Sequence, residues 1–396
     1  MKKCVLGDVA RSIQTGPFGS QLHQSDYTDC GTPVVMPKDV VNGDIVDTSI
    51  ARVGPQHVSR LSRHQLRPGN LIFSRRGDVG RCALVKKEQN GWLCGTGCLR
   101  VVVDEEKINS SYLYYFLCQS DVAKWLESHA VGAIMLNINP SIVSQIPISF
   151  PTRGAQEQIA NLLSALDRKI ALNRRKIATL EKMAKEIYDY WFVQYDFPDA
   201  NGRPYKSSGG EMVYSPELKR EIPKGWKVEQ LKDVLKVCNG KDHKSLKDGT
   251  IPVYGSGGVM RCVDTAMYSQ PSVLIPRKGT LNNIIYARKP FWCVDTIFYT
   301  TSTVSNFTKY LYYSIRDMDF MSLNTGTAVP SMTAGVIGLI AIPMPTLGLL
   351  ESFDKTLEHL FLSRDSAQDE VDRLITLRDF LLPLLMNGQV RIGGVA

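Results

Sequence analysis

The side chains best suited to chemistry in this 396-residue chain are nine cysteines and six histidines, and neither set is spaced like a catalytic or metal site. The closest cysteines are Cys94 and Cys98 in "CGTGC", with Cys82 upstream. A structural zinc site ordinarily needs four ligands in two close pairs, and no second pair is evident. We therefore interpret these cysteines as reduced, buried core residues, with zinc as the alternative. The histidines are scattered, at His23, His57, His64, His129, His243 and His359.

Sequence motifs of self-sufficient enzymes are missing as well. The chain has no Walker A sequence, dinucleotide fingerprint, HExxH zinc motif or GxSxG elbow. "GPFGS" lacks the Lys-Ser/Thr of a phosphate-binding loop and is more typical of a turn. Asp78 could belong to a nuclease cluster, but no second carboxylate signature accompanies it. We expect a non-catalytic chain that binds no metal or cofactor itself, which disfavours a self-sufficient nuclease or methyltransferase.

Positive charge is concentrated in two regions that are rich in predicted strands. Residues 1–103 hold fourteen Lys/Arg against eight Asp/Glu, residues 226–300 hold eleven against six, and the whole chain is +8. Loop-like stretches there, "GPFGSQLHQ", "FSRRGDVGR", "NGKDHKSLKDG" and "IPRKGTLNN", carry side chains that can hold phosphates or read bases. The alternative is ordinary solvated loop charge. The candidate DNA-binding residues are Gln21, Lys38, Arg75, Arg76, Arg81, Lys241, Lys244, Arg277, Lys278 and Asn282.

Composition is that of a globular protein, with 43% apolar and 22% charged residues. The start, "MKKCVLGDVARS", has no apolar segment of the kind that a signal peptide carries. No apolar run approaches the ~18 residues that span a membrane. We expect a cytoplasmic protein with no membrane partner.

Elements that position these loops occur twice in the chain. The segment from His129, "HAVGAIMLNINPSIVSQIPISFPT", resembles the segment from Leu323, "LNTGTAVPSMTAGVIGLIAIPMPT", at an offset of 194. "YLYYFL" and "LIFSRRG" return as "YLYYSI" and "LIPRKG". Two copies of one unit are therefore predicted, each a globular domain followed by a long helix.

Short β-rich runs, such as "GTPVVM", "CLRVVV" and "DTIFYTT", alternate with turn residues and predict mixed α/β domains. A helical stretch follows in each copy, near 111–127 and 306–323. We predict an α+β chain with the following parts: a first domain at 1–150, a first long helix at 151–192, a loop-like connector at 193–225, a second domain at 226–345, and a second long helix with its tail at 346–396.

Heptad spacing in both long helices is typical of a coiled coil. The first predicted helix, 155–192, would extend about 57 Å at ~1.5 Å per residue, and the second would end near Pro383. Net charges of +3 for residues 153–192 and −3 for residues 346–396 favour pairing of the two. The predicted pairing residues are Ile159, Leu163, Leu166, Ile177, Leu180, Phe353, Leu357, Leu360, Val371 and Leu374.

Either orientation of the pair is topologically possible, and we favour the antiparallel one, which relates the two domains by a pseudo-twofold. Alternatively, each helix packs on its own domain. Two basic domains held by a rigid pair of helices suit DNA that carries two half-sites at a fixed spacing.

These features together resemble the specificity subunit (HsdS) of type I restriction–modification systems. The resemblance covers essentially the whole chain and rests on "LGDV" and "LKDV" at the domain starts, taken as strands, on "GPFGSQL", on "IPKGW" and above all on "AQEQIANLLSALDRKIALNRRKIATLEKMAKEIYDYWF". The second helix departs from the pattern, since "LGLLESFDKTLEHLFLS" lacks the Gln-Glu pair.

The resemblance implies that each domain is a target recognition domain, which reads one half of a bipartite, asymmetric DNA site. It also implies two methyltransferase subunits, which use S-adenosylmethionine to methylate adenine, and two restriction subunits, which use ATP and Mg. Ile170, Arg174 and Lys176 would then contact either a partner or the other helix. The rival hypothesis is a coiled-coil scaffold with two protein-binding heads, and salt dependence of DNA binding separates the two.

Overall fold

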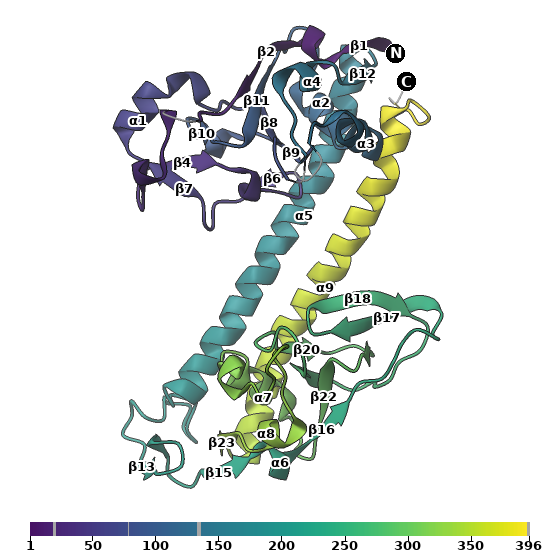
Figure 1. Cartoon of the computed structure of the whole chain (residues 1–396). Coiled ribbons are helices and arrows are strands. Elements are labelled where there is room, and N and C mark those ends of the chain that lie inside the picture. Colours follow the sequence, from purple (N-terminus) through teal and green to yellow (C-terminus); the bar gives the residue numbers. More distant parts are fainter. Residues whose placement is uncertain (19–20, 78, 133–135, 394–396) are drawn as a thin grey trace. The chain divides into compact units, whose positions relative to one another are not determined.

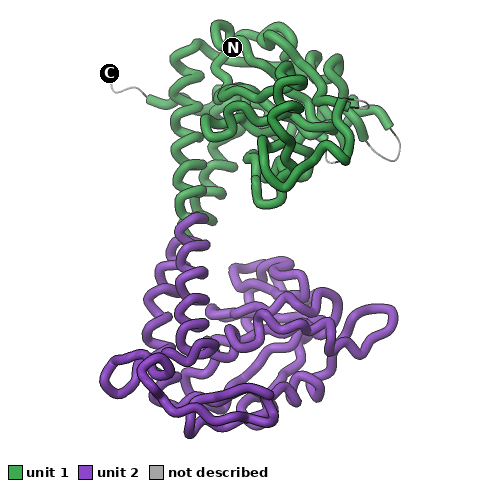
Figure 2. Tube along the Cα trace, turned by 90° about the vertical axis from the view of Figure 1, so that its left-hand side faces the viewer, with its two compact units in different colours: residues 1–173, 369–396 green, residues 174–368 purple. Residues whose placement is uncertain are grey.

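The computed structural model describes residues 1–18, 21–77, 79–132 and 136–393. The chain divides into two compact units, residues 1–173 with 369–396 (unit 1) and residues 174–368 (unit 2), which Figure 2 distinguishes by colour. Two long helices, α5 (Arg153–Tyr188) and α9 (Leu347–Met386), contribute residues to both units.

Unit 1 is built on an antiparallel sheet with the strand order β2-β11-β8-β9 (Figure 1). These strands are β2 (Ala10–Thr15), β11 (Cys98–Val103), β8 (Leu71–Ser74) and β9 (Cys82–Leu84). A second sheet has the order β10-β4-β7-β3, with β10 and β4 parallel. Its strands are β10 (Leu93–Cys94), β4 (Thr32–Val35), β7 (Ala51–Val53) and β3 (Tyr27–Thr28). Two short pairs complete the strands: β1 (Lys2–Val5) with β12 (Pro147–Phe150), and β5 (Val40–Val41) with β6 (Asp44–Ile45).

Helices cover the first sheet of unit 1 and close its core. They are α2 (Ser110–Leu117), α3 (Ser120–His129) and α4 (Pro140–Ser144), whereas α1 (Pro55–Arg60) packs on the second sheet through Val58. Asn109 caps α2 by accepting a 2.9 Å hydrogen bond from the N–H of Tyr112, and Asn139 caps α4 in the same way. The largest core cluster of the unit joins these helices to Ile159 and Leu163 of α5 and to Leu385 and Met386 of α9.

Unit 2 has an antiparallel sheet of the same form, in the order β16-β22-β19-β20. Its strands are β16 (Leu235–Asn239), β22 (Ile297–Ser302), β19 (Ser272–Pro276) and β20 (Ile285–Ala287). A three-stranded sheet, β18-β17-β21, includes the parallel pair β17–β21. Its strands are β18 (Gly258–Val263), β17 (Asp248–Gly255) and β21 (Trp292–Cys293). Strands β15 (Lys227–Gln230) and β23 (Ala341–Met344) pair, and the helices are α6 (Leu231–Val234), α7 (Thr308–Ile315) and α8 (Ala334–Gly338).

Several expectations about elements are wrong in detail. "LGDV" and "LKDV" are not strands: Leu6–Val9 is a 3₁₀ turn and Leu231–Val234 is α6, because in each the two apolar residues are buried on one side of a helical turn. The helical stretch expected near 111–127 is present as two helices, which are separated where Gln119 becomes extended and its side chain donates to the Phe116 carbonyl. The stretch at 306–323 likewise divides into α7 and a 3₁₀ turn, Phe320–Leu323.

The long helices also end differently from the prediction. The first ends as an α-helix at Tyr188 and continues as a π-helical turn, Asp189–Val193. The second runs through Pro383 to Met386. Proline removes a backbone donor and normally ends a helix, but here the next turn carries Leu385 and Met386, which are fully buried in the core of unit 1.

The segment predicted as a loop-like connector, 193–225, is instead ordered and part of unit 2. It contains a hairpin of β13 (Met212–Ser215) and β14 (Arg220–Pro223). Tyr195 and Phe197 are buried in the core of unit 2, where Phe197 stacks on Trp226 at 5.5 Å. Buried aromatic side chains therefore fix this segment in unit 2, and glycines with positive φ, such as Gly202 and Gly209, form its turns.

Within each unit the two long helices contact one another. In unit 1, Asp167 pairs with Arg378 at 2.9 Å, and Asn173 donates a 2.8 Å hydrogen bond to Glu370. Unit 2 has contacts of Phe353 with the rings of Tyr188, Trp191 and Phe192. In unit 2, Arg364 also lies 4.0 Å from Glu181. Residue numbers rise along α5 as they fall along α9, so the helices run in opposite directions within each unit.

Burial supports only part of the predicted helix seam. Ile159, Leu163, Phe353, Leu357 and Val371 are buried. Leu166, Ile177, Leu180, Leu360 and Leu374 are half-buried. Ile159 and Leu163 belong to the same hydrophobic cluster as residues of the unit 1 sheet, and Phe353 and Leu357 to that of the unit 2 sheet. These four predicted pairing residues therefore pack on the globular part of their unit as well as on the other helix.

Candidate nucleic-acid interface

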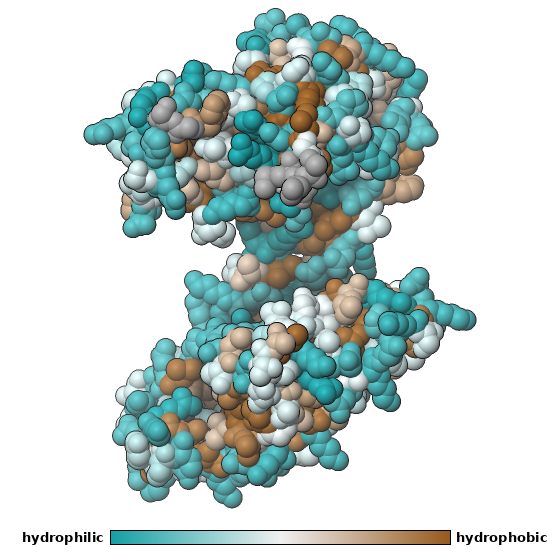
Figure 3. All heavy atoms as spheres, viewed as in Figure 1, coloured by the Kyte–Doolittle hydropathy of each residue, from teal (hydrophilic) through white to brown (hydrophobic). Residues whose placement is uncertain are grey.

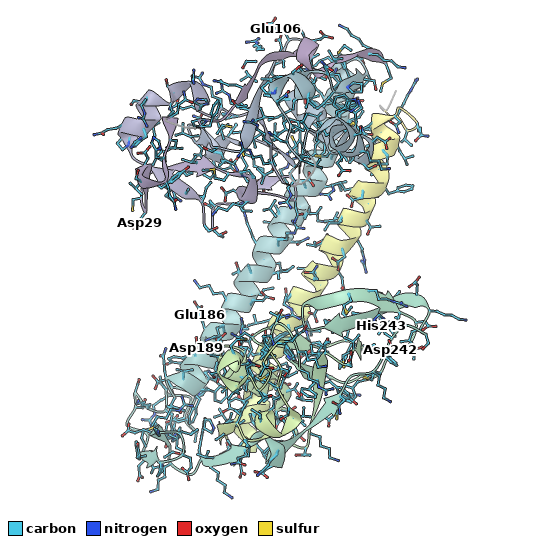
Figure 4. The ribbon with its side chains drawn as sticks, in the orientation of Figure 1. Asp29, Glu106, Glu186, Asp189, Asp242 and His243 are labelled. Atoms are coloured by element: carbon cyan, nitrogen blue, oxygen red, sulfur yellow. The ribbon has the colours of Figure 1, made fainter. Side chains whose placement is uncertain are left out.

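A cleft of about 840 Å³ opens in unit 2 beside the β17–β18 hairpin. The cleft is lined by Asp242, His243, Lys244, Gly255, Ser256, Gly257, Gly258, Val259, Met260, Val294, Asp295 and Thr296. Asp242 and His243 are labelled in Figure 4. In the view of Figure 3, hydrophilic residues predominate at the end of unit 2 where β17 and β18 lie.

Backbone hydrogen bonds hold the walls of this cleft in place. The N–H of Lys241 donates to the Cys293 carbonyl at 2.9 Å, and the Trp292 indole donates back to the Lys241 carbonyl at 3.0 Å. Val294 donates to the Tyr254 carbonyl at 3.0 Å. The 240–247 loop is thereby fixed to β21, and the end of β21 is fixed to β17.

The turn between β19 and β20 is bonded to two residues that line the cleft, Thr296 and Ser256. The N–H groups of Arg277 and Lys278 both donate to the Thr296 carbonyl, at 2.8 and 3.1 Å. Asn283 donates a 2.8 Å hydrogen bond to the Ser256 carbonyl. Gly279 has φ of 87°, and a Cβ there would lie 3.0 Å from Ser256 Oγ, so glycine allows the turn to approach the cleft so closely.

Two groups in the 240–247 loop define its electrostatics. The N–H of Lys244 donates to the Asp242 carboxylate at 3.1 Å, and this hydrogen bond lowers the pKa of Asp242 below its usual value. His243 is half-buried, and its Nδ1 has no hydrogen-bond partner among the residues that the structure describes. The loop therefore presents the ionised carboxylate of Asp242 and the ammonium group of Lys244, while the Nδ1 atom of His243 is buried.

The structure places four of the five candidate residues of unit 2 in or beside the cleft, and Asn282 is bonded elsewhere. Lys244 lines the cleft, Lys241 precedes its first lining residue, and Arg277 and Lys278 bond to Thr296 on its edge. Lys241, Lys244 and Lys278 are exposed. The Arg277 guanidinium is half-buried and lies 5.7 Å from the centre of the Phe298 ring.

Asn282 is the least available of these five. Its Nδ2 lies 3.4 Å from an Asp319 carboxylate oxygen, and its Oδ1 accepts from the N–H of Met321 at 3.2 Å. The amide thus anchors the 3₁₀ turn that follows α7. Contact of Asn282 with DNA stays a prediction, and it would require these two bonds to be exchanged.

In unit 1, Arg75, Arg76 and Arg81 lie on the turn between β8 and β9. Arg75 is half-buried, its Nε donates a 3.0 Å hydrogen bond to Asn137, and burial lowers the pKa of its guanidinium. Arg76 is exposed and forms an isolated β-bridge with Asn137. Arg81 is exposed, and its carbonyl accepts from the N–H of Ser74 at 2.8 Å.

Gln21 and Lys38 lie outside this turn. Lys38 is exposed, and its ammonium donates a 3.0 Å hydrogen bond to the Ser49 carbonyl. Gln21 is half-buried, and its carbonyl accepts from Arg60 at 3.0 Å. Asp78 lies outside the described residues.

The basic turns of the two units are held in the same way. Arg75 donates its N–H to the Gly97 carbonyl, as Arg277 does to Thr296, both at 2.8 Å. The Arg75 carbonyl accepts from the N–H of Ile138, and the Arg277 carbonyl accepts from that of Met332. Isolated bridges link Arg76 to Asn137 and Lys278 to Ser331. Both turns therefore place two cations beside the strand ends of their own unit.

Sequence reasoning missed the residues that support these turns. Asn137 and Ser331 lie in the repeated segment before the long helix, and each pairs with a turn more than fifty residues earlier. The 194-residue offset between 137 and 331 was the available signal, since it equals the offset of the repeat. Asp295, on the edge of the cleft, carried no sequence signal.

The cysteines and histidines show no grouping for chemistry. Cys82, Cys94 and Cys98 are buried, as predicted, and burial raises the pKa of the Cys94 thiol to about 12. Among the described residues, no three His, Cys, Asp or Glu side chains gather as a metal would need. Within the part of the chain that the structure describes, no helix has the length and apolar character of a membrane span.

Comparison with known proteins gives consistent similarities. The family model described as Type I restriction modification DNA specificity domain matches residues 1–182 and 223–358. The type I restriction enzyme MjaIX specificity subunit of Methanocaldococcus jannaschii is 24% identical over 397 residues, covering 93% of this chain and 88% of that protein. The HindI specificity subunit of Haemophilus influenzae is 20% identical, covering 98% and 99%.

A solved structure has the same fold. The crystal structure of the type I restriction–modification system S subunit from M. genitalium superposes with a TM-score of 0.63 at 18% identity. The superposition covers 97% of this chain and 95% of that one.

Proposed function

Because the chain belongs to the family of type I restriction modification DNA specificity domains, we propose that it is the sequence-reading subunit of such a complex. Each globular domain reads one half of a bipartite, asymmetric DNA site. The observation that carries this proposal is the pair of basic turns, Arg75–Arg76 and Arg277–Lys278, which identical backbone bonds hold beside the strand ends of their own units. Guanidinium and ammonium groups at fixed positions suit phosphate oxygens and guanine edges.

The two units are proposed to be copies of one recognition domain. The order β2-β11-β8-β9 in unit 1 corresponds to β16-β22-β19-β20 in unit 2, and each unit has a parallel pair, β10–β4 or β21–β17. Repeated landmarks in the sequence at an offset of 194 support the same correspondence. A pseudo-twofold relation of the domains follows from this proposal, and two related readers suit a split site.

The long helices are proposed to form an antiparallel coiled-coil spacer that sets the gap between the half-sites. Opposed pairs within each unit support this, Asp167 with Arg378 in unit 1 and the Phe353 ring with that of Tyr188 in unit 2. A spacer of fixed length converts directly into a fixed number of base pairs, at about 3.4 Å per pair.

Partner subunits are proposed to supply the catalysis. The chain would bind two methyltransferase subunits, which use S-adenosylmethionine to methylate adenine, and two restriction subunits, which use ATP and Mg. The names of these two relatives, both specificity subunits, support a non-catalytic role, and we propose that the chain works in the cytoplasm. No cofactor is proposed for the chain itself.

A salt titration tests whether the basic turns bind DNA. The complex of the chain with its methyltransferase subunits is titrated with a duplex that contains its site, between about 50 and 200 mM salt. Neutralisation of about six phosphates predicts a slope near −5 in a plot of log K against log salt. Replacement of Arg76 and Lys278 by Gln should make the slope shallower by about 2, whereas replacement of Lys182 and Lys355, exposed on the long helices, should not. A scaffold with protein-binding heads would show weak binding and no dependence on Arg76 or Lys278.

A further inference from the structure

Asp295 stands apart among the residues of the unit 2 cleft. It lies in the turn between β21 and β22, lines the cleft and is exposed. Asp242, the other carboxylate of the cleft, accepts a hydrogen bond from its own loop. Among the described residues, no donor or cation pairs with the Asp295 carboxylate. Its acceptor oxygens are therefore available to a ligand in the cleft.

The surroundings of Asp295 are positively charged. The next residue, Thr296, is the one whose carbonyl holds the N–H groups of Arg277 and Lys278, and Lys244 lines the same cleft. These cations would attract phosphates, but a carboxylate among them repels phosphates. If the cleft faces DNA, binding removes water from the Asp295 carboxylate, and an unpaired, desolvated charge is costly. The carboxylate therefore favours binding only where the DNA offers it a hydrogen-bond donor.

Base edges in the major groove offer few donors. Guanine presents only acceptors there, thymine an acceptor and a methyl group, while adenine N6 and cytosine N4 carry the exocyclic amino groups. A carboxylate accepts from an amino group and is repelled by the guanine and thymine acceptors.

We propose that Asp295 is a specificity-determining residue for the second half-site, which accepts a hydrogen bond from the exocyclic amino group of one adenine or cytosine in the major groove. The proposal rests on the proposed function, since it assigns a base contact within the same cleft. The cations at the rim of the cleft bind the phosphate backbone of the DNA. The Asp295 carboxylate favours a base pair whose amino group is presented on one particular strand at that position.

Unit 1 differs at the corresponding position. Because Arg75 bonds to the Gly97 carbonyl as Arg277 bonds to that of Thr296, Thr96 corresponds to Asp295. The Thr96 hydroxyl donates a 2.7 Å hydrogen bond to the Pro17 carbonyl within unit 1. The carboxylate contact therefore belongs to the second half-site alone, as an asymmetric site requires.

The test measures coupling between Asp295 and one amino group. The complex with the methyltransferase subunits is bound to duplexes of its site in which adenines of the second half-site are replaced singly by purine, and cytosines by pyrimidin-2-one. Both analogues lack the exocyclic amino group. The wild-type complex should lose about tenfold in affinity at one position, and Asp295→Ala should lose nothing further at that position. Asp233→Ala, an exposed aspartate of α6 outside the cleft, should keep the tenfold loss.

Equal losses in the wild type and Asp295→Ala at every position of the second half-site would overturn the assignment while leaving the proposed function intact. A wild-type complex that prefers no duplex over random DNA would instead refute the proposed function. Unchanged losses for Asp295→Ala at the other positions of the second half-site, which unit 2 is proposed to read, establish that unit 2 of the variant is folded, so a failure to fold cannot imitate the expected result.

Discussion

Arg378 on α9 lies 2.9 Å from the carboxylate of Asp167 on α5, within unit 1. The other carboxylate oxygen of Asp167 accepts a 2.6 Å hydrogen bond from the hydroxyl of Tyr115 on α2. One carboxylate thus connects both long helices to the globular part of the unit.

Loss of this connection should destabilise unit 1 modestly. Asp167→Ala removes the acceptor of two partners, and because the ion pair is about one-third exposed, we expect a loss of about 1–2 kcal/mol in the free energy of unfolding. Arg378→Gln should cost less, because Tyr115 keeps its acceptor. Urea denaturation of the two variants measures the difference, and equal losses would contradict this assignment of the two bonds.

Lys309 should be the most costly single charge to remove in unit 2. Its side chain is 3% exposed and its ammonium lies 3.0 Å from Asp354 and 2.5 Å from Glu358 on α9. Lys309→Met leaves these carboxylates without the buried partner, so we expect a loss of about 3 kcal/mol in the free energy of unfolding. Lys355→Met, which removes an exposed lysine of α9, is the control and should change stability by less than about 0.5 kcal/mol. A similar small change for Lys309→Met would refute this role.

The same cluster should make stability depend on acid. Burial raises the pKa of Glu358, but its bonds to Lys309 and Arg288 outweigh burial, and the folded pKa lies below the ordinary 4.5. The stabilising contribution is therefore complete above pH 4.5 and is lost as pH falls through the folded value. Glu358→Gln should flatten this part of the stability curve, measured by urea denaturation from pH 6 to 3.

His64 should make unit 1 less stable as the pH falls below 6.5, which is a higher pH range than that of Glu358. It is buried, and its Nε2 accepts from Arg63 at 3.0 Å; burial and the neighbouring arginines lower its pKa from 6.5 to about 4. Below pH 6.5 the unfolded chain binds a proton that the folded chain does not, so stability should fall by about 2 kcal/mol between pH 6.5 and 5. His64→Gln should abolish that slope, while His23→Gln, at an exposed position, should keep it. An unchanged slope in His64→Gln would exclude His64 as its source.

The proposed spacer predicts how the gap responds to helix length. One heptad is inserted into α5 after Asn173, and one into α9 before Glu370, so that the two insertions lie opposite each other. Both helices would then be longer by about 10.5 Å. Sequencing of methylated adenines should then show a longer gap between unchanged half-sites, or no methylation if assembly fails. Methylation at the original spacing would exclude the helices as the determinant of the gap.

How far the sequence predicts this molecule depends on the range of the interactions involved. Strands such as "CLRVVV", where β11 forms, follow from local apolar patterning, and both long helices follow from heptad spacing. Leu6–Val9 was misread because two buried residues three positions apart suit a helical turn, and a four-residue window cannot distinguish it from a strand. Continuation of α9 past Pro383 depends on the burial of Leu385 and Met386 in a core more than two hundred residues away in sequence.

In the candidate site, too, some features follow from local sequence and others depend on contacts between residues far apart in the sequence. Positive loops were visible in the sequence, and the structure gathers Lys241, Lys244, Arg277 and Lys278 around one cleft. The supports of those loops, Asn137 and the carbonyl of Thr296, are long-range partners that no local motif reveals.

The central claim is that this chain selects a bipartite DNA site through two separate domains. Single-molecule sequencing of methyladenine, in cells with and without the gene, tests it most directly when combined with exchange of residues 1–145 for the corresponding part of another specificity subunit. Deletion should remove one bipartite, asymmetric motif, and the exchange should change one half of that motif and leave the other half and the gap. Changes in both halves, or in the gap alone, would contradict the account, as would a motif that persists unchanged after deletion.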